Sequence, residues 1–282
     1  MGQIAVELQE QYRALQALLE QLDPHEPSTA LVVPPSPTPR GHIIVFPASF
    51  NPPTTAHLAL LHQVQEQSGA DVLVYAALSK QIVDKEHVER PTLLDRLVLL
   101  QQLLQHKLPG VGLLLFNRGL YVEQAEAVHR SFPEVSRLTF LVGFDKIIQI
   151  FDPRYYRDRD AALHQLFRLA HLLVAPRGSN GEEELRALLA QPENRQFAGA
   201  VQALPFDPSY RDISSTRVRQ NPAAHARDVP REVWHFIEET HAYEAPAAPD
   251  RPDPYEEHLR AVAAVLRKEA PGEKRCDDCR SG

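Results

Sequence analysis

The chain has 282 residues, of which 43% are hydrophobic, and its 30 basic and 37 acidic side chains give a net charge of −7. This length allows one large domain with appended segments. The negative charge argues against general binding to nucleic acid or to an anionic membrane surface, although it leaves room for a local basic pocket. No apolar run has the length of a membrane span, and no signal-peptide pattern opens the chain.

The two cysteines, Cys276 and Cys279, both lie near the C-terminus. Two cysteines cannot build a disulfide framework, so we expect a reducing compartment, cytoplasmic or nuclear. A structural zinc site needs four ligands, and this pair supplies only two of them. We therefore predict no metal site built from protein side chains.

Both ends of the chain are predicted to be appendages. Leucines recur at helical spacing over 4–22, so residues 1–23 are expected to hold an N-terminal helix. Residues 24–40 are rich in proline and are predicted to be an extended linker. A second proline-rich linker, an amphipathic helix over 255–269 and a polar tail are expected within 245–282. The terminal helices are expected to pack on the domain or to contact a protein partner or a second copy of the chain.

Strands and helices are predicted to alternate between residues 41 and 244, the segment expected to form the main domain. Short apolar runs predict buried strands at 42–46, 71–77, 111–116, 138–142, 171–175 and 202–204. Helical periodicity predicts helices from 54 or 55, from 91, and over 121–130, 144–150, 158–169, 182–190 and 231–241. This alternation predicts an α/β fold, a doubly wound and mostly parallel Rossmann-like sheet with helical appendages. Ligands of such sheets bind at the carboxyl ends of the strands.

The most informative stretch joins the first strand of the domain to its first helix. A polar turn, Ser49 to Thr54, follows the strand, and Thr54 or Thr55 is the expected N-cap of the helix. His57 would then lie in the first helical turn, where free N–H groups and the positive helix end attract anions. His57 either donates a hydrogen bond to such an anion or is an ordinary capping or surface residue.

A second helix start rich in hydroxyl groups lies roughly 160 residues further along the chain. Ser214, Ser215 and Thr216 open this helix, which carries Arg217 and Arg219 in its first turns. Two helix starts with phosphate-binding side chains are more than a generic α/β domain needs. As alternatives, the two serines are ordinary N-cap residues, and Arg217 is a surface residue on the other side of the helix from Arg219.

Two motifs carry a family resemblance, namely Ser49-Phe50-Asn51-Pro52-x-Thr54-x-x-His57 and Ile213-Ser214-Ser215-Thr216-x-x-Arg219. Together they resemble the HxGH-type nucleotidyltransferase superfamily, and within it the eukaryotic nicotinamide mononucleotide adenylyltransferases. In that branch a threonine replaces the first histidine, as Thr54 does here. Gly143-Phe144-Asp145 resembles the third motif of these enzymes, and residues 142–156 resemble a divergent fungal group. The likeness covers residues 41–242.

The resemblance implies adenylyl transfer from ATP to a phosphorylated acceptor, with pyrophosphate as the second product. It implies that His57 and Arg219 are catalytic, the first at the α-phosphate and the second at the leaving pyrophosphate. The residues expected to bind ATP are Ser49, Phe50, Thr54, His57, Gly143, Asp145, Ile213, Ser214, Ser215 and Arg219. The residues expected to bind the acceptor are Asn51, Lys80, Lys85, Arg96 and Tyr121. Mg²⁺, bound with ATP and mostly hydrated, is the expected cofactor.

Several of these residues also have structural alternatives. Asp145 could cap the helix that follows Gly143, since short acidic side chains favour helix starts. Lys80 and Lys85 lie in a polar loop, where a solvated lysine is just as reasonable as a phosphate contact. Tyr121 could pack its helix against the sheet instead of stacking on the ring of an acceptor.

Two departures from the family pattern concern the turn after the first strand of the domain and the acceptor. Ala48 stands where the family commonly has glycine, and residues 117–121 lack the tryptophan that stacks on the pyridine ring in the nicotinamide enzymes. The leading hypothesis is an enzyme that joins nicotinamide mononucleotide and ATP to give NAD and pyrophosphate. The alternatives are another phosphorylated acceptor, hydrolysis of ATP, and a nucleotide-binding regulatory or scaffold protein whose terminal helices bind partners.

Overall fold

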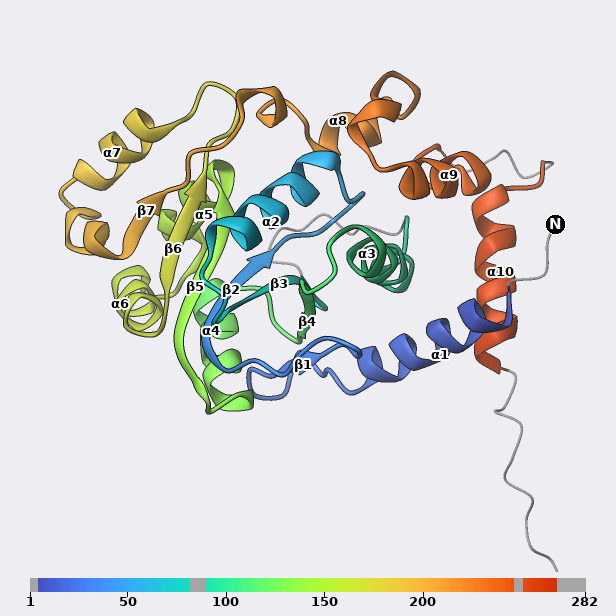
Figure 1. Cartoon of the computed structure of the whole chain (residues 1–282), viewed down its shortest axis with the longest axis horizontal. Coiled ribbons are helices and arrows are strands. Elements are labelled where there is room, and N and C mark those ends of the chain that lie inside the picture. The colour runs from blue at the N-terminus through green and yellow to red at the C-terminus, as the bar shows by residue number, and fades with distance from the viewer. Residues whose placement is uncertain (1–4, 82–89, 246–250, 268–282) are drawn as a thin grey trace, which may run out of the picture.

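The computed structural model describes residues 5–81, 90–245 and 251–267. Within these residues seven strands form one sheet in the order β1-β4-β3-β2-β5-β6-β7, and helices cover both of its faces (Figure 1). Strand β1 runs antiparallel to β4, and the other neighbouring strands are parallel. The predicted fold class, a doubly wound and mostly parallel α/β sheet with helical appendages, is confirmed.

The predicted strands and helices that fall in the described residues are present, with ends within a few residues of those expected. The strands are β1 (Ala30–Val32), β2 (Gly41–Pro47), β3 (Val72–Ser79), β4 (Gly112–Phe116), β5 (Val135–Gly143), β6 (His171–Ala175) and β7 (Val201–Ala203). The helices are α1 (Val6–Glu20), α2 (Thr55–Gln67), α3 (Leu93–Lys107), α4 (Tyr121–Ser131), α5 (Phe144–Phe151), α6 (Arg159–Leu169), α7 (Glu182–Ala190), α8 (Ser215–Gln220), α9 (Arg231–Thr240) and α10 (Pro254–Arg267).

The strands read as continuous apolar runs because each face of the sheet is buried. Successive residues of a strand point to opposite faces. In β2, Ile44 and Phe46 therefore join the core beneath α1, α2, α3 and α10, whereas Ile43 and Val45 join the core beneath α4, α5 and α6. The two cores together fix β2 in the middle of the molecule.

The order of the strands reverses at β2, and this reversal positions the site. From β2 the chain builds the sheet outward through β3 and β4 on one side, and through β5, β6 and β7 on the other. Strands β2 and β5 are neighbours, and they end at Pro47 and Gly143. A crevice at the carboxyl ends of such a strand pair is the usual ligand site of a doubly wound sheet.

Residues 24–40, predicted to be an extended linker, contain strand β1. Its three residues, Ala30 to Val32, pair with β4 and add an antiparallel edge to the sheet. The prolines of this segment flank the apolar triplet and do not interrupt it, so its N–H groups can enter the ladder. The segment is therefore part of the sheet at these residues, while the division of the chain into domains stays a prediction.

The terminal helices pack on the domain, which is one of the two alternatives that the sequence left open. Leu15 and Leu19 of α1 and Val262 and Val265 of α10 belong to the same buried core. Arg13 of α1 also donates from Nε to the backbone carbonyl of Val265 at 3.0 Å. Figure 1 shows that α1 and α10 meet at one edge of the molecule, on the side where α3 lies.

A buried carboxylate joins these helices to α3. Asp95 of α3 is 1% exposed and accepts hydrogen bonds from the Tyr12 hydroxyl (3.2 Å), the Tyr255 hydroxyl (2.7 Å) and His258 Nε2 (2.8 Å). Burial by itself would raise the pKa of Asp95, but the donors, His258 foremost, outweigh it, so the pKa lies below its usual value. A charge this deep is tolerated only because its partners are in place.

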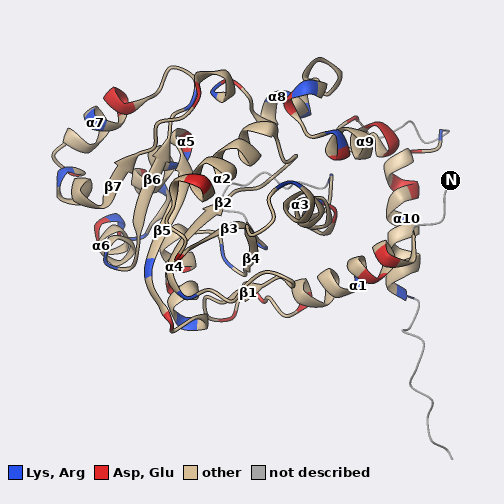
Figure 2. Cartoon of the chain, in the orientation of Figure 1, with Lys and Arg blue, Asp and Glu red and all other residues tan. Residues whose placement is uncertain are grey.

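Charged residues of both signs are interspersed on helices such as α6, α7 and α9 (Figure 2). No helix in the described ranges is long and apolar enough to cross a membrane. In the same ranges, no group of three or more potential metal ligands comes together. The predicted residues Lys85, Cys276 and Cys279 lie outside the described residues.

Candidate active site

Two adjoining cavities open at the carboxyl ends of β2 and β5. The larger, here named the motif cavity, has a volume of about 390 Å³ and is lined by the turn after β2 and the starts of α2, α5 and α8. The smaller, named the side cavity, is lined by the end of β3 and the start of α4, with further residues of α5. The two share a wall made by Pro47, Ala48, Ser49, Lys146 and Gln149.

The motif cavity brings together the two motifs that lie far apart in the sequence. Of the ten residues predicted to bind ATP, all but Phe50 line it, namely Ser49, Thr54, His57, Gly143, Asp145, Ile213, Ser214, Ser215 and Arg219. The individual roles of these residues stay predictions.

His57 is held in one tautomer by the start of α2. Thr54 is the N-cap, and its hydroxyl accepts a hydrogen bond from the His57 backbone N–H at 3.3 Å. In return, the Thr54 backbone N–H donates to Nδ1 of His57 at 3.0 Å. Nδ1 is therefore the unprotonated nitrogen, and the neutral ring carries its proton on Nε2.

The ring of His57 lies inside the protein and keeps part of its surface for the motif cavity that it lines. Burial, and after it the charge of Arg177, lowers the pKa of His57 to about 3. At neutral pH the imidazole is therefore uncharged. With Nδ1 engaged by Thr54, the N–H at Nε2 is the group that His57 can offer to a ligand.

We expect the free energy of unfolding to decrease as the pH falls from about 6.5 toward 3. In the unfolded chain His57 binds a proton near pH 6.5, whereas in the fold it stays neutral down to about pH 3. Each pH unit in this window costs about 1.4 kcal/mol through this residue. Urea unfolding of the wild type and of His57→Gln at pH 7.5 and pH 5 should show a difference of about 2 kcal/mol in their pH dependence. Equal pH dependence in the two proteins would contradict the low pKa.

Phe50 lies behind the wall of the motif cavity, although it was predicted among the ATP-binding residues. Its φ angle is 44°, in the left-handed region, and its ring is fully buried. The ring packs edge-on against His57, with centroids 5.0 Å apart, and against Phe46 at 5.7 Å. Burial in the core stabilises an apolar ring more than a place beside a phosphate would, so the side chain of Phe50 supports His57. The backbone contact to ATP predicted for Phe50 stays a prediction.

The second motif is tied to the first by hydrogen bonds. Arg219 donates from Nη1 to the backbone carbonyl of Asn51 at 2.8 Å, and Ser215 donates from its hydroxyl to the carbonyl of Pro52 at 2.8 Å. Ser214 is the N-cap of α8, as its structural alternative predicted, and its hydroxyl accepts a backbone N–H of that helix at 3.2 Å. These contacts place Arg219 in the wall of the motif cavity, against the turn after β2.

Asp145 forms an ion pair that the sequence did not predict. Its Oδ2 lies 2.7 Å from Nε of Arg177, and the Asp145 side chain is 56% exposed and that of Arg177 39%, so the pair adds little to stability. Asp145 does not cap α5, because Gly143 is the N-cap of that helix and no side chain there makes the cap bond. Arg177 and Arg211 line the motif cavity as well. The available signal for Arg177 was its place two residues after a predicted strand.

Arg96 and Tyr121, both predicted to bind the acceptor, line the side cavity. Arg96 is 3% exposed and donates from Nη1 to the carbonyl of Ser49 at 2.9 Å, while its buried Nε has no hydrogen-bond partner in the described part of the chain. Tyr121 meets Phe140 edge-on at 5.3 Å, so it packs on the sheet, as its structural alternative predicted, and also faces the cavity. Both residues line the space next to the turn after β2.

The other three residues predicted to bind the acceptor are elsewhere. Asn51 lines the motif cavity, not the side cavity, and its Oδ1 accepts a hydrogen bond from the Tyr243 hydroxyl at 2.8 Å. Lys80 lines neither cavity, because its ammonium group donates to the carbonyl of Leu19, near the end of α1, at 2.8 Å. The predicted acceptor contact of Lys80 is thus replaced by a contact within the fold, and Lys85 is outside the described residues.

A doubly wound sheet with both motifs at its switch point defines a protein with the nucleotidyltransferase fold. The chain belongs to the cytidylyltransferase-like family, whose sequence model matches residues 45–221. A putative nicotinamide mononucleotide adenylyltransferase from Schizosaccharomyces pombe is 23% identical over 220 residues, which are 71% of this chain and 86% of that protein. The resemblance indicated by the motifs is thus confirmed.

One solved structure shows the same fold at low sequence identity. It is the Plasmodium falciparum nicotinic acid mononucleotide adenylyltransferase complexed with APC, and its TM-score against this chain is 0.50. The match covers 73% of this chain and 98% of the other, at 12% identity. At this identity the likeness supports the fold, and the chemistry has to be argued from the residues.

Proposed function

We propose that the protein transfers the adenylyl group of ATP to a pyridine mononucleotide, with nicotinamide mononucleotide as the leading acceptor and NAD and pyrophosphate as products. The observation that carries the proposal is the meeting of His57 and Arg219 in one cavity at the switch point of the sheet. A second cavity with a buried arginine adjoins it, so two phosphorylated ligands have adjacent places. The names of the Schizosaccharomyces relative and the Plasmodium enzyme, both mononucleotide adenylyltransferases, agree with this.

In the reaction, an oxygen of the acceptor phosphate forms a bond to the α-phosphorus of ATP while the bond from that phosphorus to the β-phosphate oxygen breaks. No proton has to move to or from the protein, so catalysis depends on position and on stabilising charge. His57 donates from Nε2 to a non-bridging oxygen of the α-phosphate, where negative charge builds up. Arg219 stabilises the charge of the leaving pyrophosphate.

Arg96 is suited to bind the acceptor phosphate. A buried guanidinium is costly unless anions or acceptors surround it, and the Nε of Arg96, which finds no partner among the described residues, is such an unmet donor. Its other contact, to the Ser49 carbonyl, places it at the wall shared by the two cavities. An acceptor phosphate bound there lies next to the turn after β2, as in-line attack on the α-phosphorus requires.

Mg²⁺ enters this proposal with ATP, as part of the substrate. The described residues offer no cluster of carboxylates and histidines to hold the ion, and Asp145 is paired with Arg177. Mg²⁺ commonly keeps most of its waters and binds through substrate phosphates. The residues of the motif cavity fit a hydrated metal–nucleotide complex, in which the ion neutralises part of the triphosphate charge.

A pyrophosphate-release assay with a panel of acceptors tests the proposal. Nicotinamide mononucleotide should support release together with formation of NAD, and nicotinate mononucleotide and unrelated phosphorylated compounds serve as comparisons. Release of phosphate or pyrophosphate with water alone would favour hydrolysis of ATP. Binding of ATP without turnover on any acceptor would favour the regulatory or scaffold alternative.

Replacing Arg96 with glutamine is expected to raise KM for the mononucleotide about 10- to 100-fold, because a charge-assisted hydrogen bond to phosphate is lost. KM for ATP should change far less, since Arg96 lines the side cavity and not the motif cavity. Steady-state kinetics with each substrate varied in turn measures both constants. Arg217→Gln is the matched control, because Arg217 is exposed and its guanidinium donates locally, to the Asp212 carbonyl. An equal rise in both KM values for Arg96→Gln would contradict its assignment to the acceptor.

A further inference from the structure

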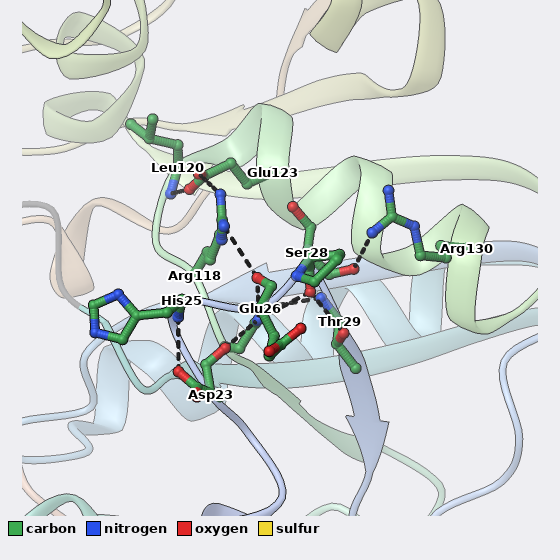
Figure 3. A network of polar contacts seen from close by, with 11 residues as sticks. Asp23, His25, Glu26, Ser28, Thr29, Arg118, Leu120, Glu123 and Arg130 are labelled. Carbon is green, nitrogen blue, oxygen red and sulfur yellow. Dashed lines mark hydrogen bonds and ion pairs between the residues drawn. The ribbon is translucent and has the colours of Figure 1, made fainter.

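The segment 23–29, between α1 and β1, contacts the end of β4 beside the side cavity. Its backbone carbonyls receive hydrogen bonds from the two residues that follow β4, Asn117 and Arg118. Figure 3 shows this network, with Arg118 between the segment and the start of α4. Nearby, Lys80 at the end of β3 binds the carbonyl of Leu19, so α1 is attached to the neighbouring strand end as well.

Asn117 uses its whole side-chain amide on this segment. Its Nδ2 donates to the carbonyls of Asp23 at 2.8 Å, Pro27 at 3.1 Å and Glu26 at 3.3 Å, and its Oδ1 accepts from the N–H of Thr29 at 2.8 Å. The side chain is 1% exposed, so water cannot replace these partners without opening the structure. The segment and the residues after β4 are therefore ordered together.

Arg118 contacts the same segment, 23–29, and also the start of α4. Its Nη2 donates to the carbonyl of Glu26 at 3.0 Å, and its Nη1 pairs with the carboxylate of Glu123 at 3.0 Å. The second oxygen of Glu123 accepts the backbone N–H of Leu120 at 3.2 Å, at the start of α4 (Figure 3). One guanidinium thus connects the N-terminal segment to the first turn of α4.

The turn between β4 and α4 forms a wall of the side cavity, because Gly119, Leu120 and Tyr121 all line it. Gln124 joins this wall to β3, because its Nε2 donates to the Gly119 carbonyl at 3.2 Å and to the Ser79 hydroxyl at 3.0 Å. The position of this wall in the side cavity, which Arg96 also lines, therefore depends on contacts that begin in the N-terminal segment.

We propose that Asn117 and Arg118 are positioning residues for the acceptor, and that segment 23–29 helps to shape the acceptor site through them. The inference rests on the proposed function, since it takes the side cavity as the place of the mononucleotide. A wall that is already fixed before binding spares the ligand the entropy cost of ordering it. The N-terminal extension would then contribute to acceptor affinity without touching the acceptor.

The test replaces Arg118, which is partly exposed, because replacing the buried Asn117 would remove more hydrogen bonds and destabilise the fold. Arg118→Gln should raise KM for nicotinamide mononucleotide about tenfold, and leave kcat and KM for ATP within about twofold of wild type. Arg118→Lys keeps the charge beside Glu123 and should recover part of the loss. The matched control is Arg130→Gln, because Arg130 contacts the same segment at the Ser28 carbonyl, but from the last turn of α4. It should leave both KM values unchanged.

A wild-type KM for the mononucleotide in Arg118→Gln would overturn the inference, and so would equal rises in the KM values of both substrates. Amide hydrogen exchange supplies a readout that does not depend on turnover. Faster exchange at Leu120 and Tyr121 in Arg118→Gln, with none in Arg130→Gln, is the expected result, and unchanged exchange would overturn the inference. Failure of the wild type to release pyrophosphate with any acceptor would instead remove the proposed function, and the acceptor role of the turn with it.

Discussion

Replacing His57 with alanine is expected to lower turnover about a hundredfold, the usual cost of removing a preorganised donor from developing charge. The donor is preorganised because Thr54 fixes the tautomer and Phe50 packs against the ring. The low pKa means that the ring contributes a neutral N–H and not a positive charge. The activity should therefore show no acid limb that belongs to His57 between pH 5 and pH 8. Initial rates of pyrophosphate release across that range measure both effects.

His62→Ala is the control for this substitution, because His62 lies on the same helix and is exposed. It should leave turnover unchanged. Turnover of His57→Ala within a few-fold of wild type would show that the ring does not act on the transferred phosphate. A bell-shaped pH profile that loses its acid limb in His57→Ala would show that the ring titrates during catalysis.

Replacing Asp95 with alanine is expected to destabilise the fold by about 3 to 5 kcal/mol, the range for breaking a buried charged network from one side. Tyr12, Tyr255 and His258 would then lose the acceptor that their donors now share. Because these residues belong to α1 and α10, both terminal helices should loosen together. Urea unfolding measures the loss, and limited proteolysis near α10 shows whether that helix detaches first.

Tyr12→Phe is the milder comparison, because it removes one hydroxyl and leaves the carboxylate two other helix-borne donors. Its cost should be about 1 kcal/mol, the usual value of a single hydrogen bond. A loss below that value in Asp95→Ala would show that hydrophobic packing alone holds the terminal helices.

The strands and the motif residues could be predicted because their signals are local. Runs such as 42–46 and 171–175 are apolar throughout, since both faces of the sheet are buried. The turn before His57 and the hydroxyl groups before Arg219 mark helix starts, whose capping chemistry is set by neighbours in the sequence. That both starts meet in one cavity follows from the parallel order of the strands, which the alternation of elements also predicts.

The contacts that sequence reasoning missed join residues far apart in the chain. Lys80 looks like a loop lysine, and only the fold shows the Leu19 carbonyl that it binds. Arg177 and Asp145 carry no mutual signal in the sequence, yet they form an ion pair in the motif cavity. Strand β1 has three residues, which is too short for a periodic pattern, and the prolines around it favoured the linker interpretation.

The wall shared by the two cavities has a consequence for the end of the catalytic cycle. Under the proposed function, the substrates enter as two molecules, one for each cavity, but the dinucleotide leaves as one molecule that spans the wall shared by both. The two halves of the dinucleotide are covalently linked. When one half dissociates, the other half, still bound, keeps it near its cavity at high effective concentration and favours rebinding. Departure of the dinucleotide should then be slower than departure of either substrate under the proposed function.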